Sequence, residues 1–190
     1  MAKGYASTDL VQSVGNLTLT EAQRDQWRVL LGAAEDTIDQ ITGRSFVADG
    51  TAAAYVTRLF DGDGTRTLVV DDLLTLNELT VDDIVVASTD YVLKPTNTTP
   101  KVTIVLLYSA ASRDRENVDV EGIWGYSTTP PEAIQMATAI LVARKLSAPA
   151  WLRSQAVDGY AATYAGGTGG IPDEVRDLIS PYIRHNVVAI

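Results

Sequence analysis

One helix-forming segment is apolar on nearly all of its sides, and the need to cover it constrains the fold of this chain most. Pro131 stands at its start, and charge is confined to Glu132 at the beginning and to Arg144 and Lys145 shortly before the end at about Ser147. Proline suits the first turn of a helix, and these charges suit the helix dipole. The apolar members between them are Ala133, Ile134, Met136, Ala137, Ala139, Ile140, Leu141, Val142 and Ala143.

A helix that is apolar all round must be covered all round. One other long helix in a short domain covers about half of the helix over 131–147. We therefore expect a neighbouring subunit to cover part of the rest. Cover by the β region of the same chain is the alternative.

A strand interrupted by glycine precedes this helix. Asn117–Glu121 alternates apolar and polar residues, which is the pattern of a half-buried strand. Gly122 and Gly125 follow, where the backbone can bend or another segment can approach closely. Trp124 and Tyr126 stand beside them, so this passage joins a strand with two aromatic residues to the apolar helix.

A second long helix is predicted over 20–43. Thr20 and Gln23 have the spacing of a capping box, and Gly43 is the expected stop. The apolar residues at helical spacing are Trp27, Leu30, Leu31, Ala34, Ile38 and Ile41. For Trp27, core packing is favoured over a binding role.

Residues 53–120 carry β signals. The strand candidates are Tyr55–Phe60, Thr67–Val70, Leu76–Val81, Ile84–Ala87, Tyr91–Lys94 and Val102–Tyr108. Asp61–Gly64 predicts a hairpin turn between the first two. The expected fold is α+β, a small helical bundle with an antiparallel β region inserted between the first and second long helices.

The chain is expected to have four parts. Residues 1–18 are predicted to form an arm that is ordered only if a neighbour orders it. Residues 19–147 form the core, and 148–171, with a run of glycines, form a flexible linker. Residues 172–190 form a helix and tail, in which Pro181 either kinks the helix or starts a second short one.

The residue inventory argues against an enzyme. The absence of cysteine excludes a disulfide scaffold, a thiolate metal site and a cysteine nucleophile. His185 is the only histidine, which excludes a histidine-rich metal site within one chain and leaves a serine triad one candidate base near the terminus. Asp61–Gly64 lacks the glycine and glutamate of a calcium loop, and the pairs Asp71–Asp72 and Asp82–Asp83 are typical of solvated turns. We expect no catalytic residue, no metal and no cofactor.

Charge and hydropathy limit the partners. The net charge of −9 disfavours tight binding to phosphate, and solubility is its simplest explanation. No apolar run approaches the roughly 20 residues that a membrane-spanning helix needs. The first residues show no secretory signal, so we expect neither membrane nor secretion.

Several passages resemble, in their order and spacing, the head–tail adaptor (connector) proteins of long-tailed double-stranded DNA phages. The family's strand end with valine and two glycines matches Val120 to Tyr126, and its proline-proline helix start matches Pro130 to Ile134. Ile41–Phe46 resembles the end of the family's first helix, and Asp90–Leu93 resembles a strand of its middle region. The resemblance spans residues 20–185.

The resemblance implies a structural protein without enzymatic activity. It implies a ring of about a dozen copies that joins the portal to a stopper or tail-terminator protein at the head–tail junction of the virion. Double-stranded DNA would pass through this ring without specific binding, and assembly would take place in the host cytoplasm.

Two sets of contact residues are expected on this basis. The subunit or core contact is expected to use Trp124, Tyr126, Ile134, Ala137 and Leu141. The portal contact is expected to use Tyr182, Ile183, Val187, Val188 and Ile190, because an uncharged apolar end is suited to docking on a partner. Packing of this end against its own domain is the alternative.

A β-rich binding module, for carbohydrate or another virion surface ligand, is the alternative. It would need exposed aromatic residues on the β region, which offers only Tyr55, Phe60, Tyr91 and Tyr108.

Overall fold

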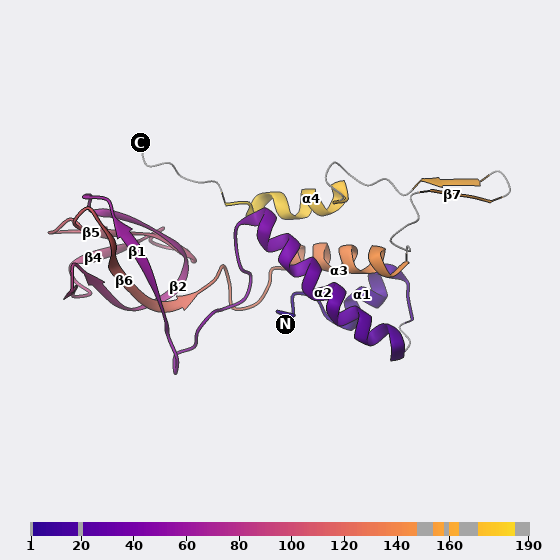
Figure 1. The fold of residues 1–190 in the computed structure, drawn as a ribbon, viewed down its shortest axis with the longest axis horizontal. Coiled ribbons are helices and arrows are strands. Elements are labelled where there is room, and N and C mark those ends of the chain that lie inside the picture. Colours follow the sequence, from indigo (N-terminus) through magenta and orange to yellow (C-terminus); the bar gives the residue numbers. More distant parts are fainter. Residues whose placement is uncertain (1, 19–20, 148–153, 158–159, 164–170, 185–190) are drawn as a thin grey trace. The chain divides into compact units, whose positions relative to one another are not determined.

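The computed structural model describes residues 2–18, 21–147, 154–157, 160–163 and 171–184. The chain divides into two compact units (Figure 1). A helical unit takes residues 1–44 and 130–190, and a β unit takes residues 45–129. The predicted mixed α+β class is confirmed.

The helical unit is organised around one helix. Its elements are α1 (Thr8–Gly15), α2 (Glu21–Thr42), α3 (Glu132–Ser147), α4 (Asp173–Ile179) and the 3-10 helix η1 (Ser180–Tyr182). α1, α2 and α4 each pack against α3, as Figure 1 shows. The predicted bounds of α2 and α3 hold to within about one residue, and Gly43 ends α2 with a positive φ of 65°.

The expectation that a neighbouring subunit must cover α3 is wrong for the single chain. Ile134, Ala137, Thr138, Ala139 and Val142 are fully buried within the chain, and Met136 is the one large apolar residue of α3 that stays exposed, at 38%. The missing cover comes from α1, in the segment that the sequence predicts as an arm. Val11 of α1 is completely buried.

Pro181 does not end the C-terminal helical structure. Ser180–Pro181 opens η1 directly after α4, which is the second of the two predicted outcomes. The linker prediction for 148–171 is wrong in part, since β7 (Ser154–Val157) and β8 (Tyr160–Thr163) pair there as a two-stranded antiparallel sheet. The glycine run lies outside the described residues.

The β unit is a six-stranded antiparallel sheet. Its strands are β1 (Val56–Gly62), β2 (Thr67–Val81), β3 (Ile84–Val85), β4 (Tyr91–Lys94), β5 (Lys101–Leu106) and β6 (Asp114–Trp124). Their order is β1-β6-β2-β5-β4, with β3 paired to β2. The predicted strands Thr67–Val70 and Leu76–Val81 are the two ends of a single strand, β2. The first part of β2 pairs with β5 and the second part pairs with β6.

The predicted hairpin at Asp61–Gly64 is wrong. β1 and β2 follow one another along the chain, but β6 lies between them in the sheet and pairs with both. The turn itself is present, with the Asp63 carboxylate accepting from the Thr65 backbone N–H at 2.8 Å. The local turn residues therefore predict the turn correctly, but they do not predict which strands pair.

Gly122 fulfils the expectation of a close approach between backbones. It lies in β6, and a Cβ placed on it would stand 2.3 Å from the carbonyl oxygen of Thr75 in β2. Gly125 serves the other expected purpose, because it holds a φ of 125° that favours glycine. The sheet core that these glycines border contains Leu73, Leu79 and Trp124 among its largest buried side chains.

We expect Gly122→Ala to destabilise the β unit by about 1–3 kcal/mol, the usual cost of overpacking. The added methyl group has no room, since β2 backbone lies against it. Urea unfolding followed by circular dichroism measures the loss.

Gly32→Ala is the matched control. Gly32 lies inside α2, and a Cβ there would meet its nearest neighbour only at 4.0 Å. The same substitution should therefore stabilise the protein by up to about 1 kcal/mol through helix propensity. Equal effects of both variants would contradict the close-approach argument.

Candidate assembly surfaces

The predicted subunit-contact residues are core residues of the two units. Trp124 is fully buried in the β unit, where its indole N–H donates to the Val56 carbonyl oxygen at 2.8 Å. The guanidinium carbon of Arg58 lies 4.7 Å from the centroid of its ring. Ile134 and Ala137 are fully buried in the helical unit. None of these side chains is free to contact another subunit.

Leu141 and Tyr126 differ in how far they are buried. Leu141 is 6% exposed, so it too belongs to the core of the helical unit. Tyr126 is half-buried, its ring centroid lies 5.4 Å from that of Phe46, and its backbone N–H donates to Ser45. Of the five residues, Tyr126 alone keeps a partly exposed side chain.

The predicted portal-contact residues are only partly described. Tyr182 and Ile183 are half-buried, and the Tyr182 carbonyl oxygen accepts from the Arg44 side chain at 2.8 Å. The Arg184 backbone N–H donates to the Thr42 carbonyl oxygen at 2.7 Å, so this segment is bonded to the end of α2. Val187, Val188 and Ile190 lie outside the described residues.

Negative charge is concentrated in the β unit. Residues 45–129 contain six basic and thirteen acidic residues, so this unit carries −7 of the chain's −9. Glu78 of β2 and Glu121 of β6 are direct cross-strand partners, and like charges in such positions repel. The Asn77 side-chain amide donates to the Glu121 carboxylate at 3.0 Å, which partly offsets that repulsion.

Of the two acidic pairs that the sequence assigns to solvated turns, Asp82–Asp83 forms a turn, but Asp71–Asp72 lies inside β2 and Asp72 is buried, at 5% exposure, so that prediction is wrong for the second pair. Asp82 has a positive φ in the turn between β2 and β3, and its carboxylate accepts from the Ser112 backbone N–H and the Asn117 side-chain amide. These hydrogen bonds lower the pKa of Asp82. Asp71 forms an ion pair with Arg58 at 3.0 Å. Within the described part of the chain, no group of three or more acidic or histidine side chains is arranged to hold a metal ion.

The β unit does not present a platform of aromatic rings. Tyr55, Phe60 and Tyr91 are half-buried, and burial raises the pKa of Tyr91. Tyr108 alone of the four is well exposed, at 75%. Stacking on a sugar needs an accessible ring face, and Tyr108 alone does not form the aromatic platform that would favour the carbohydrate-binding alternative.

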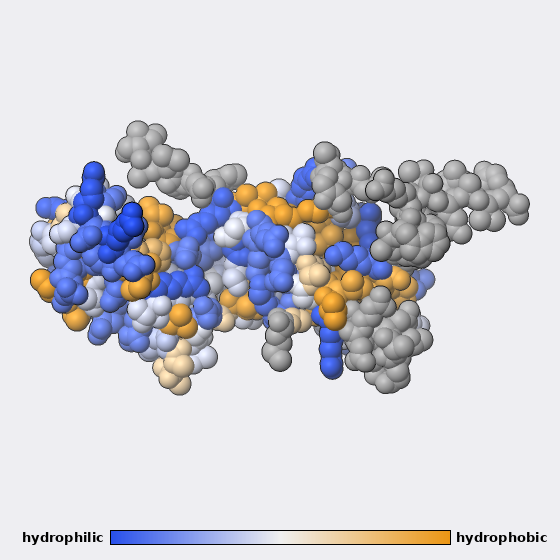
Figure 2. Space-filling view, in the orientation of Figure 1, coloured by the Kyte–Doolittle hydropathy of each residue, from blue (hydrophilic) through white to orange (hydrophobic). Residues whose placement is uncertain are grey.

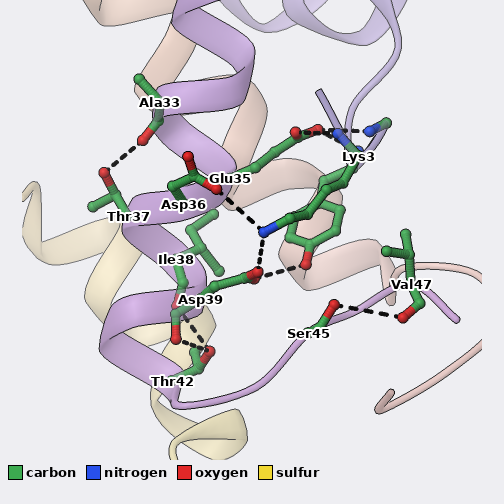
Figure 3. Close-up of polar contacts among 12 residues, drawn as sticks. Lys3, Ala33, Glu35, Asp36, Thr37, Ile38, Asp39, Thr42, Ser45 and Val47 are labelled. Atoms are coloured by element: carbon green, nitrogen blue, oxygen red, sulfur yellow. Dashed lines mark hydrogen bonds and ion pairs between the residues drawn. The ribbon is translucent and has the colours of Figure 1, made fainter. Parts of the chain in front are cut away.

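A polar cluster that the sequence analysis missed ties the N-terminal residues to α2. The Glu35 side chain is 1% exposed, and its carboxylate accepts from the backbone N–H groups of Lys3, Gly4 and Tyr5, the last two at 2.8 Å. A buried carboxylate is stabilised when such donors satisfy it. Figure 3 shows the Glu35 side chain reaching this segment from α2.

Lys3 and Tyr5 extend the cluster along the same helix. The Lys3 ammonium lies 2.6 Å from Asp39 and 3.2 Å from Asp36, as Figure 3 shows, and the Tyr5 hydroxyl donates to Asp39 at 2.6 Å. Partial burial would lower the pKa of Lys3, but the hydrogen bonds and the two negative charges outweigh it and raise that pKa. The only feature of the sequence that indicates this cluster is the acidic residues at positions 35, 36 and 39. The same pattern is equally typical of a solvent-exposed helix face.

The exposed apolar residues are scattered over both units. Figure 2 shows orange residues set among blue ones on this face. Those of the helical unit are Val14, Val29 and Met136, and those of the β unit include Leu59, Val69, Ile84 and Val85. The indole N–H of Trp27 is buried and has no acceptor among the described residues. In the part of the chain that the structure describes, no helix is long and apolar enough to cross a bilayer.

These features define an α+β protein made of a helical unit and an acidic β unit. A family model described as head completion protein matches residues 6–185, and the chain belongs to that family. The resemblance to head–tail connector proteins is thereby confirmed, and with it a structural role in head–tail connection. No curated protein sequence is similar enough to count as a relative.

Solved structures of the same fold come from gene transfer agent (GTA) particles. A chain from the neck of an empty GTA particle, computed with C6 symmetry, has a TM-score of 0.64 at 14% identity. A chain from the neck of a native GTA particle, computed with C12 symmetry, has a TM-score of 0.59 at 16% identity. Each comparison covers 100% of this chain and 95% of the other.

We expect Glu35→Ala to weaken the attachment of the N-terminal residues by about 3 kcal/mol, because hydrogen bonds to a charged group contribute about 1.5–3 kcal/mol. Hydrogen exchange at the amides of Tyr5 and Val11 measures the effect. Asp36→Asn is the control: its side chain is 66% exposed, so the loss should stay under about 1 kcal/mol. Similar exchange in both variants would contradict the assigned importance of Glu35.

The raised pKa of Lys3 predicts a loss of stability in alkali. A group whose pKa is raised on folding stabilises the fold fully below its unfolded pKa, and that stabilisation is lost as pH rises through the folded pKa. We therefore expect the stability difference between the natural chain and Lys3→Met to shrink above the ordinary lysine pKa. Urea unfolding across the alkaline range measures it, and a pH-independent difference would contradict the ion pairs.

Proposed function

We propose that this chain is a subunit of a ring-shaped adaptor that joins the portal to the stopper or tail. The main observation that supports this proposal is the match of the head completion family model over residues 6–185. The shared fold with chains from GTA necks, one of them computed with C12 symmetry, supports a ring of twelve copies at the head–tail junction. Such a ring uses a head-to-tail contact that closes on itself.

The proposed arrangement treats the β unit as an insertion in the helical unit. The helical unit receives residues from both sides of the β unit in sequence, which supports this description. Residues 19–147 then form the adaptor core, with the segment after α3 leading to a C-terminal part at 172–190. Tyr126, which is half-buried at the return from the β unit, stays a proposed subunit-contact residue.

The charge distribution supports passage of DNA without binding. Tight recognition of DNA begins when lysine and arginine neutralise phosphates. The β unit has a formal charge of −7 and therefore repels a phosphate backbone. We propose that DNA leaving the head slides through the ring, with this unit contributing part of the channel's negative potential.

We propose that the C-terminal residues contact the portal. Tyr182 and Ile183 are held at the end of α2 by the bonds from Arg44 and Arg184. Val187, Val188 and Ile190 would supply the apolar side chains of the contact. Assembly on the portal would take place in the cytoplasm of the host.

The direct test uses particles made without this chain. Purified chain added to such heads should restore a collar at one vertex in electron micrographs, and tails should then join. Heads that gain tails equally well without the chain, or a chain that appears elsewhere on the particle, would refute the proposed function.

A truncated chain ending at Arg184 should fold normally and lose the portal. The truncation keeps η1 and the Arg184–Thr42 hydrogen bond, so circular dichroism should not change. Its retention on immobilised portal protein should fall at least about tenfold, which corresponds to a loss of about 1.4 kcal/mol. The full-length variant Asn186→Ser serves as control, and unchanged retention of the truncated chain would refute the C-terminal contact.

A further inference from the structure

The hairpin of β7 and β8 has an open edge on each side within the described part of the chain. The two strands pair with each other in a regular register, from Ser154 opposite Thr163 to Val157 opposite Tyr160, and no other described strand joins them. Each strand makes its main contacts with the other and not with a described helix. A two-stranded hairpin by itself is only marginally stable in water, and a third strand or a helix is needed to stabilise it.

These two edges lack the features that usually keep a strand edge from pairing. Charged residues, prolines and bulges discourage such pairing. The six-stranded sheet has them at both of its ends. β1 carries Arg58 and has a register shift between Phe60 and Gly62, and β4 ends at Lys94, directly before Pro95. By contrast, β7 and β8 contain no charged residue and no proline, and their register has no shift, so their edges are suited to take up another strand.

The register shows which backbone groups face outward. Two residues separate Val157 from Tyr160, so these two form the hydrogen-bonded pair that closes the turn. Hydrogen-bonded and non-hydrogen-bonded pairs alternate along antiparallel strands. The pair Ala156–Ala161 is therefore not hydrogen-bonded within the hairpin, and its backbone N–H and C=O groups point to the outer edges. The same holds for Ser154, two positions further along β7.

We infer that the hairpins of neighbouring ring subunits pair edge to edge, β8 of one copy with β7 of the next, in one closed sheet around the ring axis. β7 and β8 run in opposite directions and have four residues each, so this contact continues the antiparallel pattern. A head-to-tail repeat uses both edges of every hairpin and leaves none open. A single strand from another protein would cover one edge only. The inference rests on the proposed function, because it names a contact between ring subunits.

Charge and dimensions agree with this contact. The two strands are uncharged and belong to the helical unit, so copies meet here without the repulsion that the −7 of the β unit would cause. Twelve hairpins whose strands lie about 4.8 Å apart close into a ring at least about 37 Å across, measured between backbones. A DNA double helix fits through an opening of this size, as the proposed passage of the genome requires.

The chain's lack of cysteine allows a covalent test. One preparation carries Ala161→Cys, and two others carry Ala156→Cys or Ser154→Cys, which cover two registers of β7 against β8. Residues opposite one another in a hydrogen-bonded antiparallel pair have Cα atoms about 5.5 Å apart, a separation that a disulfide can bridge. The Ala161→Cys chain is mixed with each of the other two, assembled on heads that lack the chain, and oxidised.

Edge pairing predicts a covalent dimer between the two variants in at least one of these mixtures. A mixture of Ala161→Cys with Thr57→Cys, an exposed β1 residue, is the control for chance collisions and should give at least tenfold less dimer. Dimer yields no higher than this control in both mixtures would overturn the inference.

Proline on either edge tests the backbone contact itself. Ala156→Pro and Ala161→Pro each remove an N–H group that the hairpin does not use internally, so the circular dichroism spectrum should not change. Each should lower the number of heads with a restored collar at least tenfold. Ala156→Ser and Ala161→Ser keep the N–H group and should restore collars as the natural chain does. Proline variants that restore collars equally well would refute the pairing.

The outcomes separate this inference from the proposed function. Collars lost in the proline variants without any specific dimer would mean that another protein covers the edges, which also overturns the inference. If the natural chain itself restores no collar, the proposed function fails instead. The two cysteine mixtures, oxidised as concentrated protein in solution, then decide the pairing: a dimer above the control supports it, and a yield equal to the control overturns it.

Discussion

The requirement to cover α3 determines how the helical unit is built. A helix with alanine, valine, leucine and isoleucine on all sides loses stability wherever one side meets water, since each buried methylene contributes about 0.8 kcal/mol. Three helices from different parts of the chain meet this requirement together. The sequence shows that α3 must be covered. It does not show that α1 covers it, because α1 is short and has an ordinary composition.

The position of α1 depends on an interaction that no local pattern records. Glu35 offers its buried carboxylate to three successive backbone N–H groups, and those groups belong to residues about thirty positions earlier. Neither a helical stripe nor a turn motif marks such a pair. For that reason the prediction of an arm at 1–18 misses the ordered segment that contains α1. The bounds of α2 and α3, which depend on periodicity and end residues, are predicted almost to the residue.

The β unit shows the same division between local and long-range information. β4 was predicted with its observed bounds, and the glycine positions in and after β6 were interpreted correctly. The pairing of β1 with β6 was missed, because the Asp61–Gly64 turn favours a hairpin and nothing in it shows that a strand over fifty residues later inserts beside β1. Similarly, the sequence does not distinguish burial of Trp124 and Ile134 in the core of the chain from burial in an interface between subunits.

For the proposed ring, charge limits where the subunits can meet. The β unit carries −7 while the helical unit carries −2, so contacts between β units of neighbouring copies would bring together like charges. The repulsion is weaker between helical units, which also hold the exposed Val14, Val29 and Met136. A ring that joins copies through their helical units therefore avoids the strongest repulsion.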